Sequence, residues 1–188
     1  METQLAPGFL VASPQLKDPF FEKTVIFLLE HDHNEGTFGI IMNKLANIQL
    51  NEVFSELNIS LSEEIKHTKL PQIVEGGPVT PELGWVIHSS DWSSEKTKLF
   101  CESVGVTASL EILQDIAIGQ GPARFWFCLG YSGWGPKQLM KEIQIGSWLH
   151  LPFSADLFFD IPHEQIWKAA IGKLGIDPAY FSPLMGGA

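Results

Sequence analysis

At 188 residues, with 45% hydrophobic and 18% charged side chains, the composition is that of one globular domain and excludes a largely disordered chain. Acidic residues outnumber basic ones 22 to 12 and Arg124 is the only arginine, so direct binding to DNA or RNA, which depends on clustered Lys and Arg, is disfavoured. The N-terminal residues lack a basic segment followed by a long apolar run, and no apolar run reaches membrane-spanning length, so we expect a cytoplasmic protein without a membrane span.

Short apolar runs bounded by Gly, Pro and Asn predict strands of ordinary length. The predicted strands are Gly8–Ala12, Thr24–Glu30, Thr37–Asn43, Gln72–Glu75, Gly84–Ser89, Lys98–Thr107, Ala123–Tyr131 and Ala155–Phe159. Several are apolar on both faces, which favours a sheet that helices cover or that is partly closed on itself. Cys101 and Cys128 fall inside two of these runs and form no CxxC pair, so we predict reduced core thiols.

Helical periodicity predicts helices at Leu50–Leu57, Leu110–Ile118, Pro136–Ile145 and His163–Leu174. Ser109 can cap the second helix, Pro136 suits the first turn of the third, and Gly175 suits a left-handed end to the fourth. The charged segment Ile59–Pro71 is predicted to be a surface loop. Strands and helices are interspersed without a regular βα repeat, so the predicted fold class is α+β, as a single domain over residues 1–188.

The segment Glu30–Gly36 is the densest polar cluster in the chain. If the strand continued through it, His31 and His33 would share a face and could bind a divalent metal. Asn34 and Gly36 are typical of a turn between two strands. We favour a solvated turn, and we predict neither a metal site nor a bound cofactor.

Two further features could have a chemical role. Gly76 and Gly77 could present backbone N–H groups to an anion, but they lack the Lys and helix that follow a phosphate loop, so a tight turn is the simpler interpretation. His88 ends an apolar strand and could act as an acid, a base or a ligand near pH 7. A histidine at a strand end more often makes a structural hydrogen bond.

The segment Leu129–Leu139 predicts a strand, a glycine-rich turn and the start of a helix. It differs from the nucleophile elbow of serine hydrolases because Trp134 stands where that motif needs a glycine after Ser132. The alternatives are an anion site at the helix start and a close turn covered by an aromatic ring, and we favour the turn. Gln138 and Glu142 lie four residues apart, so they share a helix face and can bond each other or face a cleft.

The order of the motifs along nearly the whole chain is specific. They are Gly8-Phe9-Leu10, Pro14–Phe21, Thr24-Val25, Glu30-His31, Gly39–Asn43, Gly76–Val79, His88, Leu129–Trp134, Gln138-Leu139, Glu142, Trp148, Asp160, Trp167 and Leu174–Ile176. In joint order and spacing the chain resembles the AlgH/YqgE family of small bacterial proteins. That resemblance implies a bifurcated mixed β-sheet with a small barrel-like part surrounded by helices. Two positions depart from the family pattern: Ser132 replaces an expected Ala, and Gly186-Gly187-Ala188 lacks a histidine before the final Ala.

The family label implies a regulator of transcription, and no helix-turn-helix is present, so we expect action through a protein partner and not by direct DNA binding. The alternative is a small-molecule or nucleotide-binding protein, or an enzyme, with a polar cleft. The candidate cleft residues are Thr24, His31, Asn43, Gly76, Gly77, His88, Tyr131, Gln138 and Glu142. A third hypothesis is an assembly component, weakly supported by the Trp and Phe content.

Overall fold

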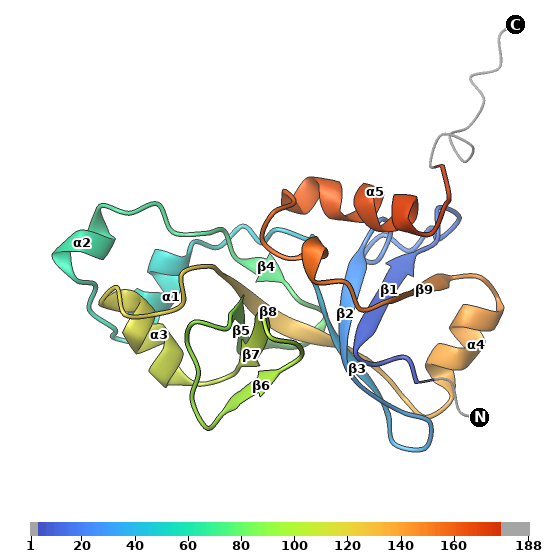
Figure 1. Ribbon diagram of the computed structural model, residues 1–188, viewed down its shortest axis with the longest axis horizontal. Coiled ribbons are helices and arrows are strands. Elements are labelled where there is room, and N and C mark those ends of the chain that lie inside the picture. The colour runs from blue at the N-terminus through green and yellow to red at the C-terminus, as the bar shows by residue number, and fades with distance from the viewer. Residues whose placement is uncertain (1–3, 178–188) are drawn as a thin grey trace, which may run out of the picture.

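The computed structural model describes residues 4–177, and within that range the chain forms a nine-stranded sheet flanked by helices (Figure 1). The strands are β1 Gly8–Ala12, β2 Val25–Asp32, β3 Gly36–Ile41, β4 Val74–Glu75, β5 Val79–Ser89, β6 Thr97–Leu99, β7 Val104–Thr107, β8 Phe125–Trp134 and β9 Trp148–Pro152. The helices are α1 Leu50–Glu56, α2 Glu63–Lys66, α3 Leu110–Ala117, α4 Gln138–Gln144 and α5 His163–Lys173, with a 3-10 turn at Ala155–Leu157.

The long strand β8 joins two parts of the sheet, whose order is β6-β7-β5-β8-β3-β2-β1-β9. Its first part pairs antiparallel with β5, where Trp85 lies opposite Cys128, and its last residues pair with β3, where Gly39 lies opposite Ser132. Strand β4 pairs parallel with β8, which makes the sheet mixed. The prediction of an α+β fold with a bifurcated, partly barrel-like sheet is therefore confirmed.

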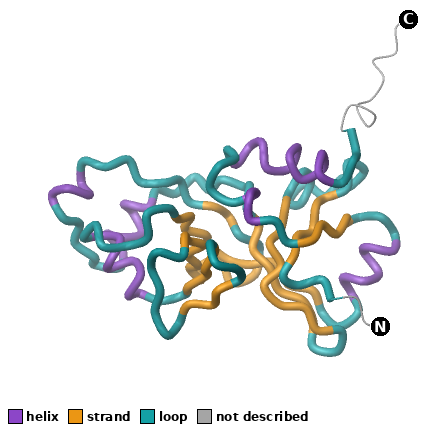
Figure 2. Tube along the Cα trace, in the orientation of Figure 1, coloured by secondary structure: helices purple, strands orange, loops and turns teal. Residues whose placement is uncertain are grey.

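The helices lie toward the outside of the molecule, and the strands meet at its centre (Figure 2). Helices α1, α2 and α3 flank the part of the sheet that contains β5 to β7, while α4 and α5 accompany β1, β2, β3 and β9 (Figure 1). Among residues 4–177, no helix combines the length and the apolar character needed to cross a bilayer.

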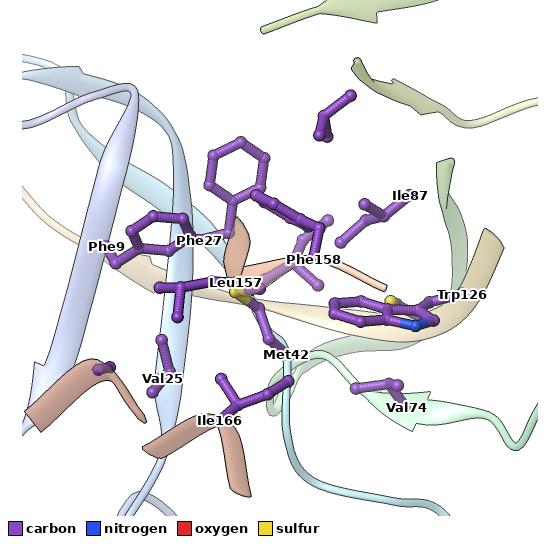
Figure 3. Close-up of a cluster of buried hydrophobic side chains, with 14 of the residues drawn as sticks. Phe9, Val25, Phe27, Met42, Val74, Ile87, Trp126, Leu157, Phe158 and Ile166 are labelled. Atoms are coloured by element: carbon purple, nitrogen blue, oxygen red, sulfur yellow. The ribbon is translucent and has the colours of Figure 1, made fainter. Parts of the chain in front are cut away.

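Side chains from both parts of the sheet share one core (Figure 3). Phe9 and Phe27 come from β1 and β2, whereas Ile87 and Trp126 come from β5 and β8. Phe158 packs among them, with its ring centroid 5.0 Å from that of Phe27. Because these side chains come from strands on both sides of β8, their burial fixes the two parts of the sheet against each other.

The helix ends agree only in part with the sequence. Gly175 adopts a positive φ of 72° directly after Leu174, the residue that caps the C-terminal end of α5, as predicted. Ser109 precedes α3 at the capping position, but its hydroxyl makes no capping hydrogen bond. The prediction for Pro136 is wrong, because α4 begins at Gln138, after Lys137 in a left-handed conformation with φ 62°.

Six segments differ from the predicted elements. Val79–Leu83 extends β5, and Ser132–Trp134, part of the predicted glycine-rich turn, extends β8. Lys98–Thr107 is not one strand but the hairpin of β6 and β7, whose turn leaves Cys101 partly exposed and only Cys128 in the core. Ala155–Phe159 is apolar because Leu157 and Phe158 pack into the core, and it pairs with no strand. Strand β9 was not predicted; it is held by pairing with β1. The short helix α2 lies inside the predicted loop.

Candidate functional site

The nine candidate cleft residues do not form a single cleft. His31 and Tyr131 line a hollow of about 620 Å³ between the turn that joins β2 to β3 and the end of β8. Gln138 and Glu142 line a second hollow of about 370 Å³ beside α4. Trp134 lies in the wall of both hollows, so the two are neighbours, and together we call them the Trp134 hollows.

Glu142 organises the second hollow. One carboxylate oxygen accepts hydrogen bonds from the indole Nε1 groups of Trp134, at 2.8 Å, and of Trp148, at 2.9 Å. The other oxygen accepts from the side-chain amide of Gln138 at 2.9 Å. Gln138 in turn accepts from the backbone N–H of Gly135 at 3.0 Å, which fixes the start of α4. The predicted shared face of Gln138 and Glu142 is confirmed, and it anchors two buried indoles that the sequence analysis had not connected.

The polar segment at residues 30–36 is a hairpin turn. His31 remains in β2, and its Nδ1 lies 2.7 Å from the Thr37 hydroxyl on β3. The backbone N–H groups of Glu35 and Asn34 donate to Asp32, and these bonds hold the pKa of that carboxyl below its ordinary value. Among residues 4–177, no three His, Cys, Asp or Glu side chains are grouped closely enough to hold a metal ion.

Thr24 and Asn43 lie together at the start of β2, in neither of the Trp134 hollows. The Asn43 amide accepts from the backbone N–H of Val25 and donates to the carbonyl of Lys23, both at 2.8 Å. The Thr24 hydroxyl donates to the carbonyl of Phe21 at 2.7 Å. Both side chains thus satisfy backbone groups where the chain enters the sheet.

Gly76 and Gly77 pack directly against β8. The backbone N–H of Gly76 donates to Leu129, and its carbonyl accepts from Ile41. A Cβ on Gly77 would lie 2.1 Å from the carbonyl group of Tyr131, and φ at Gly77 is 156°. The glycines therefore permit a close approach of two backbones, as the tight-turn interpretation requires.

His88 is fully buried in the other part of the sheet, on β5. Its Nδ1 lies 2.9 Å from the carbonyl of Ser89, which can only accept, so Nδ1 carries the proton. Nε2 of the neutral ring then accepts a hydrogen bond from the Thr107 hydroxyl. The Thr107 hydroxyl accepts from the Thr97 hydroxyl, and the Thr97 hydroxyl accepts from the backbone N–H of Ser94. Burial lowers the pKa of His88, so this hydrogen-bond chain holds a neutral imidazole.

A feature that the sequence analysis missed is an apolar groove of about 780 Å³ between α1, α3 and the start of β5. Its exposed apolar side chains are those of Ile48, Leu57, Leu83 and Leu110. Its lining also includes the buried side chains Val86, Leu113 and Phe127. Within the described part of the chain, residues 4–177, three carboxylates line it, from Glu52, Glu56 and Glu82, and no Lys, Arg or His does. We call this the α1–α3 groove.

A family model described as AlgH-like matches residues 9–179. The chain belongs to the AlgH-like family. It is 38% identical over 168 residues to a UPF0301 protein of Alcanivorax borkumensis, covering 89% of this chain and 88% of that protein. It is 36% identical to a UPF0301 protein of Psychrobacter cryohalolentis, covering 100% of this chain and 99% of that protein. The resemblance inferred from the ordered motifs is therefore confirmed.

Solved structures agree with the AlgH-like fold. The solution structure of the AlgH protein from Pseudomonas aeruginosa has a TM-score of 0.77 and 33% identity, covering 100% of this chain and 98% of that one. The crystal structure of a protein from Corynebacterium diphtheriae has a TM-score of 0.71 at 18% identity, over 98% and 94% of the two chains. The second comparison shows the fold alone, and none of these names states an activity.

Proposed function

We propose that this AlgH-like chain is a regulatory protein that acts by binding a protein partner in the α1–α3 groove, and not by binding DNA directly. One observation supports this proposal most strongly. Of the nine large hydrophobic side chains exposed among residues 4–177, four line this single groove: Ile48, Leu57, Leu83 and Leu110. A gathering of exposed apolar side chains, rimmed by polar residues, is typical of a protein interaction site.

The charges around the groove favour an occupant of particular chemistry. Glu52, Glu56 and Glu82 line it, and no basic side chain of the described residues does. A partner segment with apolar residues on one face and Lys or Arg beside them would bury its apolar side chains in the groove and place its cations near these carboxylates. A nucleic acid, which brings phosphates, would meet like charge there and on a chain whose net charge is −10.

The expected affinity is that of a transient contact. The four apolar side chains are 37 to 56% exposed, so covering each of them contributes roughly 1 kcal/mol at about 25 cal/mol per Å². The partner's own apolar residues add a comparable or larger amount, and the loss of translational and side-chain freedom opposes both. We therefore expect a dissociation constant in the micromolar range, which corresponds to about −8 kcal/mol.

The test uses a fluorescent amphipathic peptide with Leu at helical spacing and Lys elsewhere, with fluorescence anisotropy as the readout. Leu110→Gln should weaken binding about tenfold. Leu99→Gln is the matched control, because Leu99 and Leu110 are both 56% exposed and Leu99 does not line the groove. A peptide with Glu in place of every Lys should bind at least tenfold more weakly than the Lys peptide.

Equal binding by both variants, or by both peptides, would contradict the proposal. Analytical ultracentrifugation of the unmodified chain tests whether a second copy of the chain occupies the α1–α3 groove. A dimer that Leu110→Gln dissociates and Leu99→Gln leaves intact would replace the protein partner with self-association.

A second candidate function is small-molecule binding in the Trp134 hollows. The supporting observation is that His31, Tyr131, Gln138 and Glu142 line two neighbouring hollows that share Trp134. A thermal-shift screen with small metabolites and divalent metals tests it. A ligand at a hundred times its dissociation constant contributes about 2.7 kcal/mol, which raises the Tm by roughly 5 to 10 °C. If the rise in Tm persists in His31→Ala and Gln138→Ala, the ligand binds elsewhere and this candidate function is wrong.

A further inference from the structure

A fourth hollow, of about 670 Å³, shares no residue with the α1–α3 groove or the Trp134 hollows. It lies between the segment around Lys69, Arg124 and the first residues of β8, and the residues Phe159 and His163 before and at the start of α5. Its volume is within the range of about 300 to 1,000 Å³ typical of small-molecule sites. We call it the Arg124 hollow.

The side chains that line the Arg124 hollow differ in charge from those of the other hollows, although Asp160 pairs with Arg124. Lys69 and the only arginine of the chain, Arg124, line it, and none of the Asp or Glu residues between positions 4 and 177 does. The α1–α3 groove and both Trp134 hollows are each lined by at least two carboxylates. In a chain with a net charge of −10, the Arg124 hollow is, of these four hollows, the one whose lining suits an anion.

Arg124 has hydrogen-bonding capacity to spare. Its Nη1 donates to Asp160 at 2.5 Å, and within residues 4–177 this is the only hydrogen bond of the guanidinium group. A guanidinium has five N–H donors, so most of them remain for a ligand. The Asp160 carboxylate orients the group, and the fork geometry suits two oxygens of one phosphate.

Aromatic rings form a wall next to Arg124. The Trp126 ring centroid lies 4.6 Å from that of His163 and 5.3 Å from that of Phe159. The Arg124 guanidinium carbon lies 5.2 Å from the Phe159 ring centroid. Trp126 is buried behind Phe159 and His163, which are half-buried, so a planar ring can stack on these two while an anionic group on the same molecule reaches the guanidinium.

The backbone at Phe159 supports a specific arrangement of this wall. Phe159 has φ of 66°, in the left-handed region that costs a bulky residue free energy. Its ring is nevertheless held against Trp126 and beneath Arg124. Residues in such conformations gather at ligand sites, and here the strained residue is one of the ring contacts that define the hollow.

His163 adds an acceptor. Its Nδ1 lies 2.7 Å from the carbonyl of Met42 and therefore carries a proton. Burial lowers the pKa of His163, so near pH 7 its Nε2 is an unprotonated acceptor. An amino or hydroxyl group of a ligand can donate to it, which an apolar wall alone would not provide.

We propose that the Arg124 hollow binds a nucleoside phosphate, with the phosphate at Arg124 and Lys69 and the base against Phe159 and His163, which Trp126 supports from the core. Two cations suit a dianionic phosphate, the rings suit a planar base, and Nε2 suits a donor on the base or sugar. This site is separate from the groove of the proposed function, so either can fail while the other holds.

Isothermal titration with AMP, GMP, CMP and UMP tests the proposal, with adenosine and inorganic phosphate as fragment probes. At least one nucleotide should bind, more tightly than either fragment, and Arg124→Gln should weaken it at least tenfold. Lys98→Gln is the matched control. Lys98 and Arg124 are both 53% exposed, each is paired with a carboxylate that is 68% exposed, and each lies over a phenylalanine ring. The control should change the affinity less than twofold.

Three results would overturn the proposal: no nucleotide binds, Lys98→Gln weakens binding as much as Arg124→Gln, or His31→Ala abolishes binding, which would move the ligand to the Trp134 hollows. Thermal unfolding of each variant confirms that it is folded. Nuclear magnetic resonance gives an independent readout, because a bound nucleotide should shift the side-chain Nε–H signal of Arg124 and the backbone signal of Phe159.

Discussion

Glu142 is predicted to stabilise the fold through the two indoles that donate to it. Trp134 is 6% exposed and Trp148 is 3% exposed, so water cannot easily replace the carboxylate as their acceptor. In Glu142→Gln the amide oxygen can still accept from both indoles, but it is neutral, and its NH₂ group then faces the NH₂ group of Gln138. Two charge-assisted bonds become neutral ones, which costs about 1 kcal/mol each. We expect Glu142→Gln to lower the free energy of unfolding by about 2 kcal/mol and the Tm by roughly 4 to 8 °C.

Glu142→Leu should cost more, because both indole N–H groups then lose their acceptor. At about 1 to 3 kcal/mol for each unpaired buried donor, the expected loss is roughly 4 kcal/mol. Urea unfolding followed by tryptophan fluorescence measures both variants, with the exposed Glu56→Gln as a control in α1. A double-mutant cycle between Glu142→Gln and Trp148→Phe should show a coupling energy of about 1 kcal/mol. If the free energies of unfolding of Glu142→Gln and Glu56→Gln lie within about 0.5 kcal/mol of each other, the Glu142 carboxylate does not stabilise the fold through the two indoles.

Three further predictions concern pH, glycines and thiols. Burial lowers the pKa of His88, so below about 6.5 the unfolded chain takes up the proton first. The free energy of unfolding should be level above pH 6.5 and fall as the pH drops from there toward the folded pKa, with a smaller fall in His88→Gln; an equal slope in both would contradict this. Gly172→Ala lies in α5 with nothing within 4 Å of the added Cβ, so it should raise the free energy of unfolding by about 1 kcal/mol. Gly77→Ala should lower it by at least about 3 kcal/mol, because its Cβ would lie 2.1 Å from a carbonyl group. Urea unfolding measures both variants, and a Gly77→Ala variant more stable than Gly172→Ala would contradict the close approach of the two backbones. Cys101 should react with a thiol reagent in the native protein and the buried Cys128 only after unfolding, as mass spectrometry of the labelled peptides can test.

Local pattern determined which elements the sequence analysis could predict. Strand β1 has its predicted bounds, Gly8–Ala12, because a short apolar run between breakers is a local signal. Strand β9 has no such signal, since His150 and Pro152 interrupt its apolar residues and its stability comes from pairing with β1. Ala155–Phe159 was wrongly predicted as a strand, because its apolar residues Leu157 and Phe158 are buried in the core without forming one.

The candidate sites show the same limit. The facing of Gln138 and Glu142 follows from helical spacing and was predictable. Trp134 and Trp148 both contact Glu142 because β8 precedes α4 and β9 follows it, with both strands folded back toward the helix. The spacing of residues in the sequence does not predict this tertiary arrangement. For the Arg124 hollow, the sequence did contain one signal, a lone arginine next to two aromatic residues. Lys69 and His163 join it only through the tertiary fold.

The claim that a protein partner occupies the α1–α3 groove is tested most directly by photo-crosslinking in cells that naturally express this protein. A photoreactive amino acid is placed at position 110 in one variant and at the equally exposed position 99 in another. One partner should be crosslinked from position 110 and not from position 99, through a segment in which Lys or Arg lies beside apolar residues. Equal crosslinking from both positions, or crosslinking to nucleic acid from position 110, would contradict it.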